Sequence, residues 1–572
     1  MEFLKKINSN FFLTLKNISK FILNNLQNLE DFIIKNLNKN NYIQSPYIKE
    51  FTNQEQELKN YSPFSLISFG ILICICFLIL KKLLKKSKKI FKFFCNFKEN
   101  FVILMSKLPS NQEKIAKAKQ EVKKEMATLF KQNKFKKIDF FDNGQDEHTI
   151  LKKLEVISKS DNTAASTGKL TGAVYCGEDK IHRIASSASE IFSYSNLLHP
   201  DLYCGARFIE SQLIKIGLEL FNGKEDSCGM TTSGGTMSIL SAMYAYIHRA
   251  RENGIKKPEI ICPDSAHAAF FKACFMFRAK CIKIPLDPKT YQVDLNKVKK
   301  AINKNTACIV GSCPNFPHSL MDDIEGLNEI ALKYKIPLHV DCCLGGFLVA
   351  FYNRANINIP KFDFTLPGVT SISADLHKYG LCPKGISLLM YSKHEYRKYN
   401  FFTYPHFMGG FYCTPGFDGS RTAGISAASY AVLTSLGKNY YINIAKRINK
   451  AVLKVKEFVR KECPLFKIIG DPFICGFAIT GDKMDYLYDI LDKKGWHLNM
   501  IINPIGVGFI FTSANMENDD ELIKDIKEAH EKIKTNNLEE LSKKTKLYGM
   551  SIPLPENIAK NALDALCDAI LD

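Results

Sequence analysis

Two patterns of apolar residues alternate along the chain from about residue 165 onward. Short apolar runs of strand length are separated by amphipathic stretches of helical periodicity, at 259–262, 295–303, 307–311, 323–334 and 337–340. Strands that alternate with helices of about a dozen residues predict βαβ units and a mostly parallel sheet. We therefore expect a large α/β domain over residues 165–430, with ligands bound beyond the carboxyl ends of its strands.

The pattern changes after residue 430. A helix-rich stretch comes first, and three apolar runs follow it, at 466–470, 477–480 and 506–512. This order is typical of a smaller α+β domain, which we place at residues 431–572.

One apolar segment near the N-terminus is much longer. Residues 61–80 contain no formal charge, and eight lysines lie within the twenty residues after them, against two before. Such a segment spans a hydrocarbon core of about 30 Å, and the lysine excess marks the cytosolic side. The sequence thus predicts one transmembrane helix at 61–80, a lumenal segment at 1–60, and a basic, helical connector at 81–164. A buried core helix is the alternative, but such helices seldom lack charge over this length.

The first 37 residues carry an amphipathic pattern of their own. Apolar residues from Leu4 to Leu37 recur in steps of 3, 4 and 4, which is an 11-residue period. This pattern favours a helix that lies on a membrane surface or pairs with its twin, although chance in a biased stretch remains an alternative. Asn17 begins a glycosylation sequon, which is usable only if this end is lumenal.

Composition and charge narrow the function classes. The 572 residues are 46% hydrophobic and 24% charged, which excludes wholesale disorder. The formal net charge is +20, but much of the surplus lies beside the predicted membrane helix, where lysines meet anionic headgroups. We therefore expect a membrane lipid contact and no nucleic acid partner. Eighteen cysteines are too dilute for a disulfide scaffold and show no metal-site spacing, so we expect reduced thiols and no metal.

Four short segments carry residues of catalytic types, each close to an apolar run. A glycine-rich turn at 232–236 opens a helical stretch, so its backbone N–H groups and hydroxyls can cradle a phosphate. Asp341 ends an apolar run, where a buried carboxylate is costly unless it meets a cation. Lys378 lies among apolar and small residues, where desolvation lowers the pKa of an amine and makes it nucleophilic. His267 follows the run at 259–262.

Together these are the parts that a pyridoxal phosphate site requires. The lysine forms the Schiff base, the carboxylate keeps the pyridine nitrogen protonated, the turn holds the phosphate, and a flat side chain stacks on the ring. Each residue has an ordinary alternative: Lys378 as a surface lysine, Asp341 as a cap, and His267 as a satisfied loop histidine. Their order and their shared position after apolar runs favour the cofactor site.

The sequence around these residues resembles the sphingosine-1-phosphate lyase family. The resemblance covers roughly residues 165–550 and is carried by long motifs, namely TGAVY (171–175), LHPD (198–201), FNGKEDSCG (221–229), TSGGT (232–236), PEIICPDSAHAAF (258–270), KYKIPLHVDCCLGGFL (333–348), GVTSISADLHKYGLCPKG (368–385), GSR (419–421) and KKGWHLN (493–499). It implies a fold-type-I pyridoxal phosphate enzyme that forms a homodimer. It also implies an anchor in the endoplasmic reticulum membrane, with the catalytic part in the cytosol.

The resemblance also implies roles for single cofactor-binding positions. Lys378 would bear the Schiff base, Asp341 would pair with the pyridine nitrogen, and His267 would stack on the ring. The cofactor phosphate would be held by a set of four residues, Gly234, Gly235, Thr236 and His377.

Further positions are implied for the substrate and for the neighbouring subunit. Tyr175, His199 and Lys384 would bind the substrate phosphate, which suits a hydrogen-bonding pair beside a cation. Tyr412 would approach the active site from the neighbouring subunit. The chain departs from the family at Met237, where a Glu is usual, which leaves the groups needed for the chemistry in place.

The implied reaction is cleavage of the C2–C3 bond of a phosphorylated sphingoid base, giving a long-chain fatty aldehyde and phosphoethanolamine. The nearest alternative is a pyridoxal phosphate-dependent amino-acid decarboxylase, which shares the Gly-Gly-Thr turn and the His-Lys pair. A third hypothesis is a catalytically silent membrane scaffold. Because Lys378, Asp341 and His267 are all present, the sequence favours an enzyme, and the apolar anchor and the TGAVY and LHPD motifs favour the lyase.

Overall fold

The computed structural model describes residues 144–159, 167–316 and 318–542, together with 545, 560, 563, 564, 567 and 568. The described residues up to 542 belong to one compact unit, Leu129–Leu554. The predicted lumenal segment 1–60, the predicted membrane helix 61–80 and the connector up to 143 lie outside the described residues. Within the described ranges, no helix is long and apolar enough to cross a membrane.

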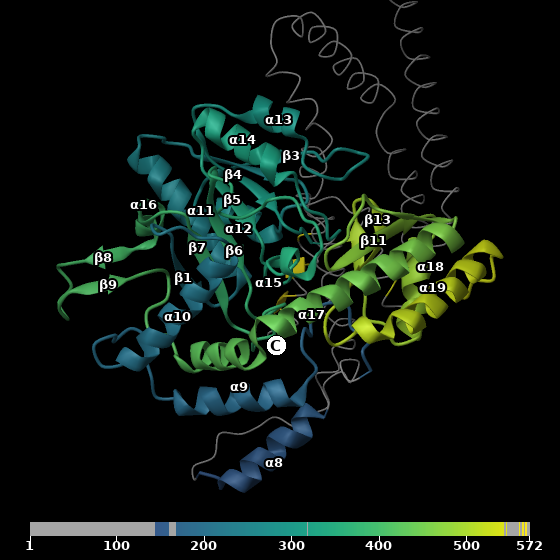
Figure 1. The fold of residues 1–572 in the computed structure, drawn as a ribbon, viewed down its shortest axis with the longest axis horizontal. Helices are drawn as coiled ribbons and strands as arrows, with labels where there is room; N and C mark the ends of the chain where they lie inside the picture. The colour runs from purple at the N-terminus through teal and green to yellow at the C-terminus, as the bar shows by residue number, and fades with distance from the viewer. Residues whose placement is uncertain are drawn as a thin grey trace, which may run out of the picture. The chain divides into compact units, whose positions relative to one another are not determined.

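A seven-stranded sheet forms the centre of this unit (Figure 1). Its strands are, in spatial order, β1 (Cys228–Thr232), β7 (Ser387–Tyr391), β6 (Val369–Ala374), β5 (Leu338–Asp341), β4 (Thr306–Ser312), β2 (Glu259–Pro263) and β3 (Lys280–Ile284). Only β7 runs antiparallel to its neighbours, and the other pairings are parallel. The prediction of an α/β fold with a mostly parallel sheet is therefore confirmed.

Helices cover both faces of this sheet. Since successive side chains of a strand point to opposite sides, each strand contributes apolar side chains to both faces. On β2, Ile260 and Cys262 join the apolar cluster under α11 (Gly235–Glu252) and α12 (Ala268–Met276). The intervening Ile261 joins the cluster on the other face. That second face is covered by α10 (Cys204–Leu220), α14 (Ile324–Tyr334) and α15 (Gly346–Val349).

Shorter elements complete the part around the large sheet. They are α8 (Glu147–Ser158), α9 (Asp179–Ile191), α13 (Leu295–Ala301), η4 (Asn353–Ala355), α16 (His394–Arg397) and η5 (Lys398–Asn400). The helical patterns expected at 295–303 and 323–334 correspond to α13 and α14.

A long helix leads to a second, smaller sheet. α17 (Gly424–Glu462) is interrupted at Gly437, whose φ of 66° and ψ of 170° are not helical. Its first segment packs beside α9 and its second segment runs to the small sheet (Figure 1). The antiparallel small sheet and its helices are, in spatial and then chain order, β10 (Phe466–Ile468), β11 (Gly476–Gly481), β13 (Ile505–Ile510), β12 (Asn499–Ile502), α18 (Met484–Lys493), η6 (Met516–Asn518) and α19 (Asp519–Lys534). The domain limits, including the one at 430 inside α17, stay predictions.

The segment 167–177 lies against the part of the chain that carries the small sheet. Thr171 donates its backbone N–H to the carbonyl of His497 at 3.1 Å, and Ser513 Oγ donates to the carbonyl of Tyr175 at 2.6 Å. Lys169 Nζ lies 5.6 Å from the ring centre of the buried Trp496, which donates Nε1–H to Asp525 at 2.8 Å. These contacts fix the position of the segment, and the segment in turn positions Tyr175 beside the large sheet.

A hairpin of β8 (Phe402–Tyr404) and β9 (Tyr412–Thr414) projects beside the large sheet (Figure 1). Its apolar side chains are exposed, most of all Met408 and Phe411, with 93% of the Phe411 side chain accessible. The sequence analysis did not predict this pair of strands, because short exposed strands carry little apolar periodicity.

Candidate active site

The glycine-rich turn lies between β1 and α11, where it leaves N–H groups free at the start of a helix. Gly234 is the N-cap of α11 and has a φ of 144°, a conformation that residues with a side chain rarely adopt. A Cβ atom on Gly234 would lie 3.3 Å from His377 Cε1. The turn and His377, which are far apart in sequence, thus lie next to each other, and the phosphate-binding role of these residues stays a prediction.

Lys378 follows β6 and lies in an ion pair with Asp375. Lys378 Nζ is 2.8 Å from Asp375 Oδ2. Burial lowers the pKa of Lys378, and the neighbouring groups, Asp375 first among them, raise it, so that the pKa lies above its ordinary value. Desolvation thus acts in the expected direction but does not set the pKa of this lysine in the chain without a cofactor. With Asp375 beside it, the amine is an ammonium ion.

Asp341 ends β5 and is almost fully buried. Its Oδ1 accepts hydrogen bonds from the backbone N–H of Cys343 at 3.0 Å and from Ser373 Oγ at 3.2 Å. No lysine, arginine or histidine of the described ranges forms an ion pair with it. A buried carboxylate without a cation is costly, so this arrangement suits a ligand that brings a protonated nitrogen.

His377 contributes an imidazole beside the turn. Its Nε2 lies 3.5 Å from Asp375 Oδ2, and its buried Nδ1 has no hydrogen-bond partner among the described residues. Burial lowers the pKa of this imidazole below its ordinary value. The charge of Asp375 opposes this lowering, and a ligand phosphate on Nδ1 would oppose it further, so that Nε2–H faces Asp375 while Nδ1–H donates to a phosphate oxygen.

Tyr175 and Lys384 contact each other near Lys378. Lys384 Nζ lies 4.8 Å from the ring centre of Tyr175 and donates to the carbonyl of His377 at 3.2 Å. Burial raises the pKa of Tyr175, so its hydroxyl stays protonated, and burial lowers the pKa of Lys384. A hydroxyl donor and an ammonium donor thus face the region of Lys378, as a binding site for a second anion requires.

Four predicted residues are not joined to this group. His267 is exposed and serves as the N-cap of α12, with Nδ1 accepting from Ala269 N at 3.2 Å. His199 and Thr236 are exposed, and within the described ranges their side chains show no contact with Lys378. Tyr412 packs against Phe402 and Phe407 in the hairpin. The roles predicted for these four residues stay predictions.

Asp375 is a member of the site to which the sequence analysis gave no role. It directly follows β6 and precedes Lys378 by three residues. The rule that found Asp341, a carboxylate just after an apolar run, applies equally to Asp375 and could have found it.

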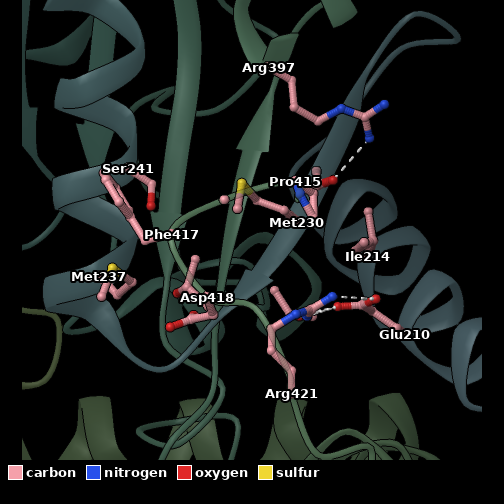
Figure 2. A pocket seen from close by; sticks show the side chains of 14 residues that line it. Glu210, Ile214, Met230, Met237, Ser241, Arg397, Pro415, Phe417, Asp418 and Arg421 are labelled. Atoms are coloured by element: carbon pink, nitrogen blue, oxygen red, sulfur yellow. Dashed lines mark hydrogen bonds and ion pairs between the residues drawn. The ribbon is translucent and has the colours of Figure 1, made fainter. Parts of the chain in front are cut away.

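A cavity of ≈ 200 Å³ opens beside the turn and is distinct from the surroundings of Lys378. Figure 2 shows Glu210 and Arg421 joined by an ion pair on one side, and Ser241 and Phe417 on the other. Arg421, from the GSR motif, also donates to Thr231 Oγ1 at 3.0 Å. Through Glu210 and Thr231, Arg421 fixes the loop before α17 to α10 and to β1, next to the glycine-rich turn.

The residues present fit pyridoxal phosphate. The free Nδ1 of His377 and the start of α11 offer a place for the phosphate, and the glycine at 234 leaves room for it. Asp341, without a cation of its own, offers a partner for a protonated ring nitrogen. Lys378 supplies the amine.

Comparisons with known proteins agree with this fit. Residues 212–476 match the family described as the pyridoxal-dependent decarboxylase conserved domain. Sphingosine-1-phosphate lyase 1 of Mus musculus is 37% identical over 528 residues, covering 88% of this chain and 91% of that protein. The sphingosine-1-phosphate lyase of Saccharomyces cerevisiae is 43% identical over 390 residues, or 66% of each chain.

Solved structures show the same relationship. A sphingosine-1-phosphate lyase of Burkholderia pseudomallei matches with a TM-score of 0.67 and 34% identity, covering 70% of this chain and 94% of that one. The glutamate decarboxylase of Lactobacillus brevis matches with a TM-score of 0.60 at 20% identity, a likeness of fold alone. The chain therefore belongs to the sphingosine-1-phosphate lyase family of pyridoxal phosphate enzymes.

Proposed function

We propose that this protein cleaves the C2–C3 bond of phosphorylated sphingoid bases, releasing a long-chain fatty aldehyde and phosphoethanolamine. One observation carries the proposal beyond family membership. Lys384 Nζ lies 4.8 Å from the ring centre of Tyr175, and the charge of Lys378 acts on both residues, which suits one ligand that carries an amine for Lys378 and a phosphate for Lys384. A 2-amino-1-phosphate carries both groups.

Different residues of the protein have different roles in the proposed reaction. Lys378 would supply the amine that holds the cofactor. Asp341 would pair with its protonated ring nitrogen, and His377 with the turn at Gly234 and Gly235 would hold its phosphate. When bound, pyridoxal phosphate supplies an electron sink for the pair left at C2 when the bond breaks. Tyr175 and Lys384 orient the substrate through its phosphate.

The test uses the full-length protein with pyridoxal phosphate and, separately, sphingosine-1-phosphate or a panel of free amino acids. Mass spectrometry should show a fatty aldehyde and phosphoethanolamine from the lipid, and both should vanish in Lys378→Ala. Carbon dioxide and an amine from an amino acid, with no aldehyde from the lipid, would instead identify a decarboxylase.

The location of the enzyme is a separate part of the proposal. Residues 61–80 anchor it in the endoplasmic reticulum membrane, with residues 1–60 lumenal and the catalytic part cytosolic. The support is the uncharged segment and the lysine excess after it. Glycosylation of Asn17 in microsomes, absent in Asn17→Gln, supports this topology. Protection of the catalytic part from added protease contradicts it.

The enzyme acts as a homodimer in this proposal. The support is the group of exposed apolar side chains on the β8–β9 hairpin, which carries Tyr412, because such groups often mark protein–protein contacts. In a dimer this hairpin reaches the neighbouring active site.

A further inference from the structure

Asp375 is the residue on which the cationic groups of the site converge. Its side chain is almost completely buried, with 1% exposed. Oδ2 lies 2.8 Å from Lys378 Nζ and 3.5 Å from His377 Nε2. Oδ1 is buried and has no hydrogen-bond partner among the described residues.

The carboxylate is also packed tightly against the glycine-rich turn. A Cβ atom on Gly235 would lie 2.7 Å from Asp375 Oδ2 and 2.8 Å from Oδ1. Contacts this short do not occur between real atoms, so any side chain at 235 displaces the carboxylate. The absence of a side chain at Gly235 therefore leaves the space that the carboxylate of Asp375 occupies.

A buried carboxylate depends on a cation nearby, because the ionised form is poorly solvated. Lys378 fills this role as an ammonium ion, and the charge of Asp375 raises its pKa. Lys378 no longer provides this ammonium ion when its amine is engaged in a covalent bond. His377 Nε2 is then the nearest remaining donor to the same oxygen.

We propose that Asp375 is a positioning residue that holds Lys378 as an ammonium ion whenever the lysine amine is free, and pairs with His377 when that amine is covalently engaged. The pairing keeps the displaced lysine within reach of the site. It also withholds the neutral amine, so the lysine does not return before the bond of the substrate has broken. The ion pair between Asp375 and the free lysine concerns the protein alone, whereas the delayed return of the lysine rests on the proposed function.

The first experiment measures the free amine directly. Full-length protein stripped of cofactor is treated with trace acetic anhydride between pH 7 and pH 11, and mass spectrometry quantifies acetylation of Lys378 against the exposed Lys361. At each pH in this range, labelling of Lys378 relative to Lys361 should rise about tenfold or more in Asp375→Asn, because a pKa lower by one unit leaves about ten times as much free amine. An unchanged ratio of Lys378 to Lys361 labelling overturns the proposal.

Two further variants separate positioning from general damage. Gly235→Ala should displace the carboxylate and raise the labelling of Lys378 relative to Lys361, so it gives an answer even if Asp375→Asn does not fold. Asp322→Asn is the matched control, because Asp322 is also buried but accepts hydrogen bonds from the backbone of Val293 and Ser312, away from the site. A rise in this labelling ratio in Asp322→Asn as large as in Asp375→Asn overturns the proposal.

Turnover by the loaded enzyme gives the second readout. With sphingosine-1-phosphate, Asp375→Asn should lower kcat about tenfold or more with little change in KM, since the ammonium contact is lost after the substrate has bound. A rise in KM with unchanged kcat contradicts the proposal. If the wild-type enzyme does not cleave this substrate, the proposed function fails, whereas the labelling experiment still decides the role of Asp375.

Discussion

At the scale of single residues, the site is a small group of charges balanced against each other. Asp375 offsets Lys378, and Lys384 is left to an anion that the protein does not supply. The pKa of Lys384 is lowered by burial and by the charge of Lys378, while Asp375 opposes the change. Lys384 is thus held near like charge, and a ligand anion would stabilise it further.

The Lys384→Met variant should raise KM for the phosphorylated substrate about 10- to 100-fold, because one charge-assisted hydrogen bond is worth about 1.5–3 kcal/mol. Steady-state kinetics across substrate concentrations measures the change. Lys361→Met, at an exposed position away from the site, should match the wild type. A KM that stays at the wild-type value in Lys384→Met would remove this residue from substrate binding.

A buried histidine outside the site makes stability depend on pH. His318 is 3% exposed and packs edge-on against Tyr291, and burial lowers its pKa to about 4. The unfolded chain binds a proton near pH 6.5 and the folded chain near 4, so stability is lost as pH falls through this window. The loss is about 2 kcal/mol at pH 5.

His318→Phe should therefore lose less thermal stability between pH 7 and pH 5 than the wild type does. Scanning calorimetry at the two pH values gives the comparison. His182→Phe, at an exposed position on α9, should keep the wild-type dependence. Equal pH dependence in His318→Phe and the wild type would contradict the assignment.

At the scale of elements, apolar periodicity predicted the strands and helices that are buried. The runs at 259–262, 307–311 and 337–340 became β2, β4 and β5, because strands buried on both faces are apolar throughout. The antiparallel direction of β7 was not predictable, since periodicity carries no direction. The hairpin was missed because its apolar side chains face solvent, which is a property of the folded molecule.

The contact between α10 and β7 tests how closely these elements pack. A Cβ atom on Gly217 would lie 2.5 Å from Leu388 Cδ1 and 3.1 Å from Met390 Sδ. Gly217→Ala should destabilise the protein by about 1–3 kcal/mol through overpacking. Gly205→Ala, on the same helix with no atom within 4 Å, should stabilise it by up to about 1 kcal/mol. Melting temperatures that move in the same direction would contradict this account.

The hairpin offers a prediction about assembly. Phe411→Asp places a charge on its exposed apolar surface and should shift the mass measured by light scattering from dimer toward monomer, with a loss of activity. Phe275→Asp on α12 is the matched control, since 84% of that side chain is also exposed. A dimer that persists in Phe411→Asp would place the interface elsewhere.

At the scale of the whole molecule, the site joins parts that are distant in sequence. The turn at 234, the carboxylate at 341 and the lysine at 378 were predictable, because each follows an apolar run of one sheet. Tyr175 was placed only through the resemblance, since no local pattern shows that segment 167–177 crosses from the small sheet to Lys378. The contact of Lys378 with Asp375 was not foreseen, and it opposes the lowering of the lysine pKa by burial.

The attachment of this segment also gives the enzyme an optical reporter. Trp496 is the only tryptophan in 572 residues, and Lys169 of the segment lies over its ring. Its fluorescence therefore comes from one known place, where the polypeptide that carries Tyr175 is fastened. Detachment of that polypeptide removes a cation from the indole and changes its emission, so a stopped-flow instrument can time the opening of the site in unlabelled protein.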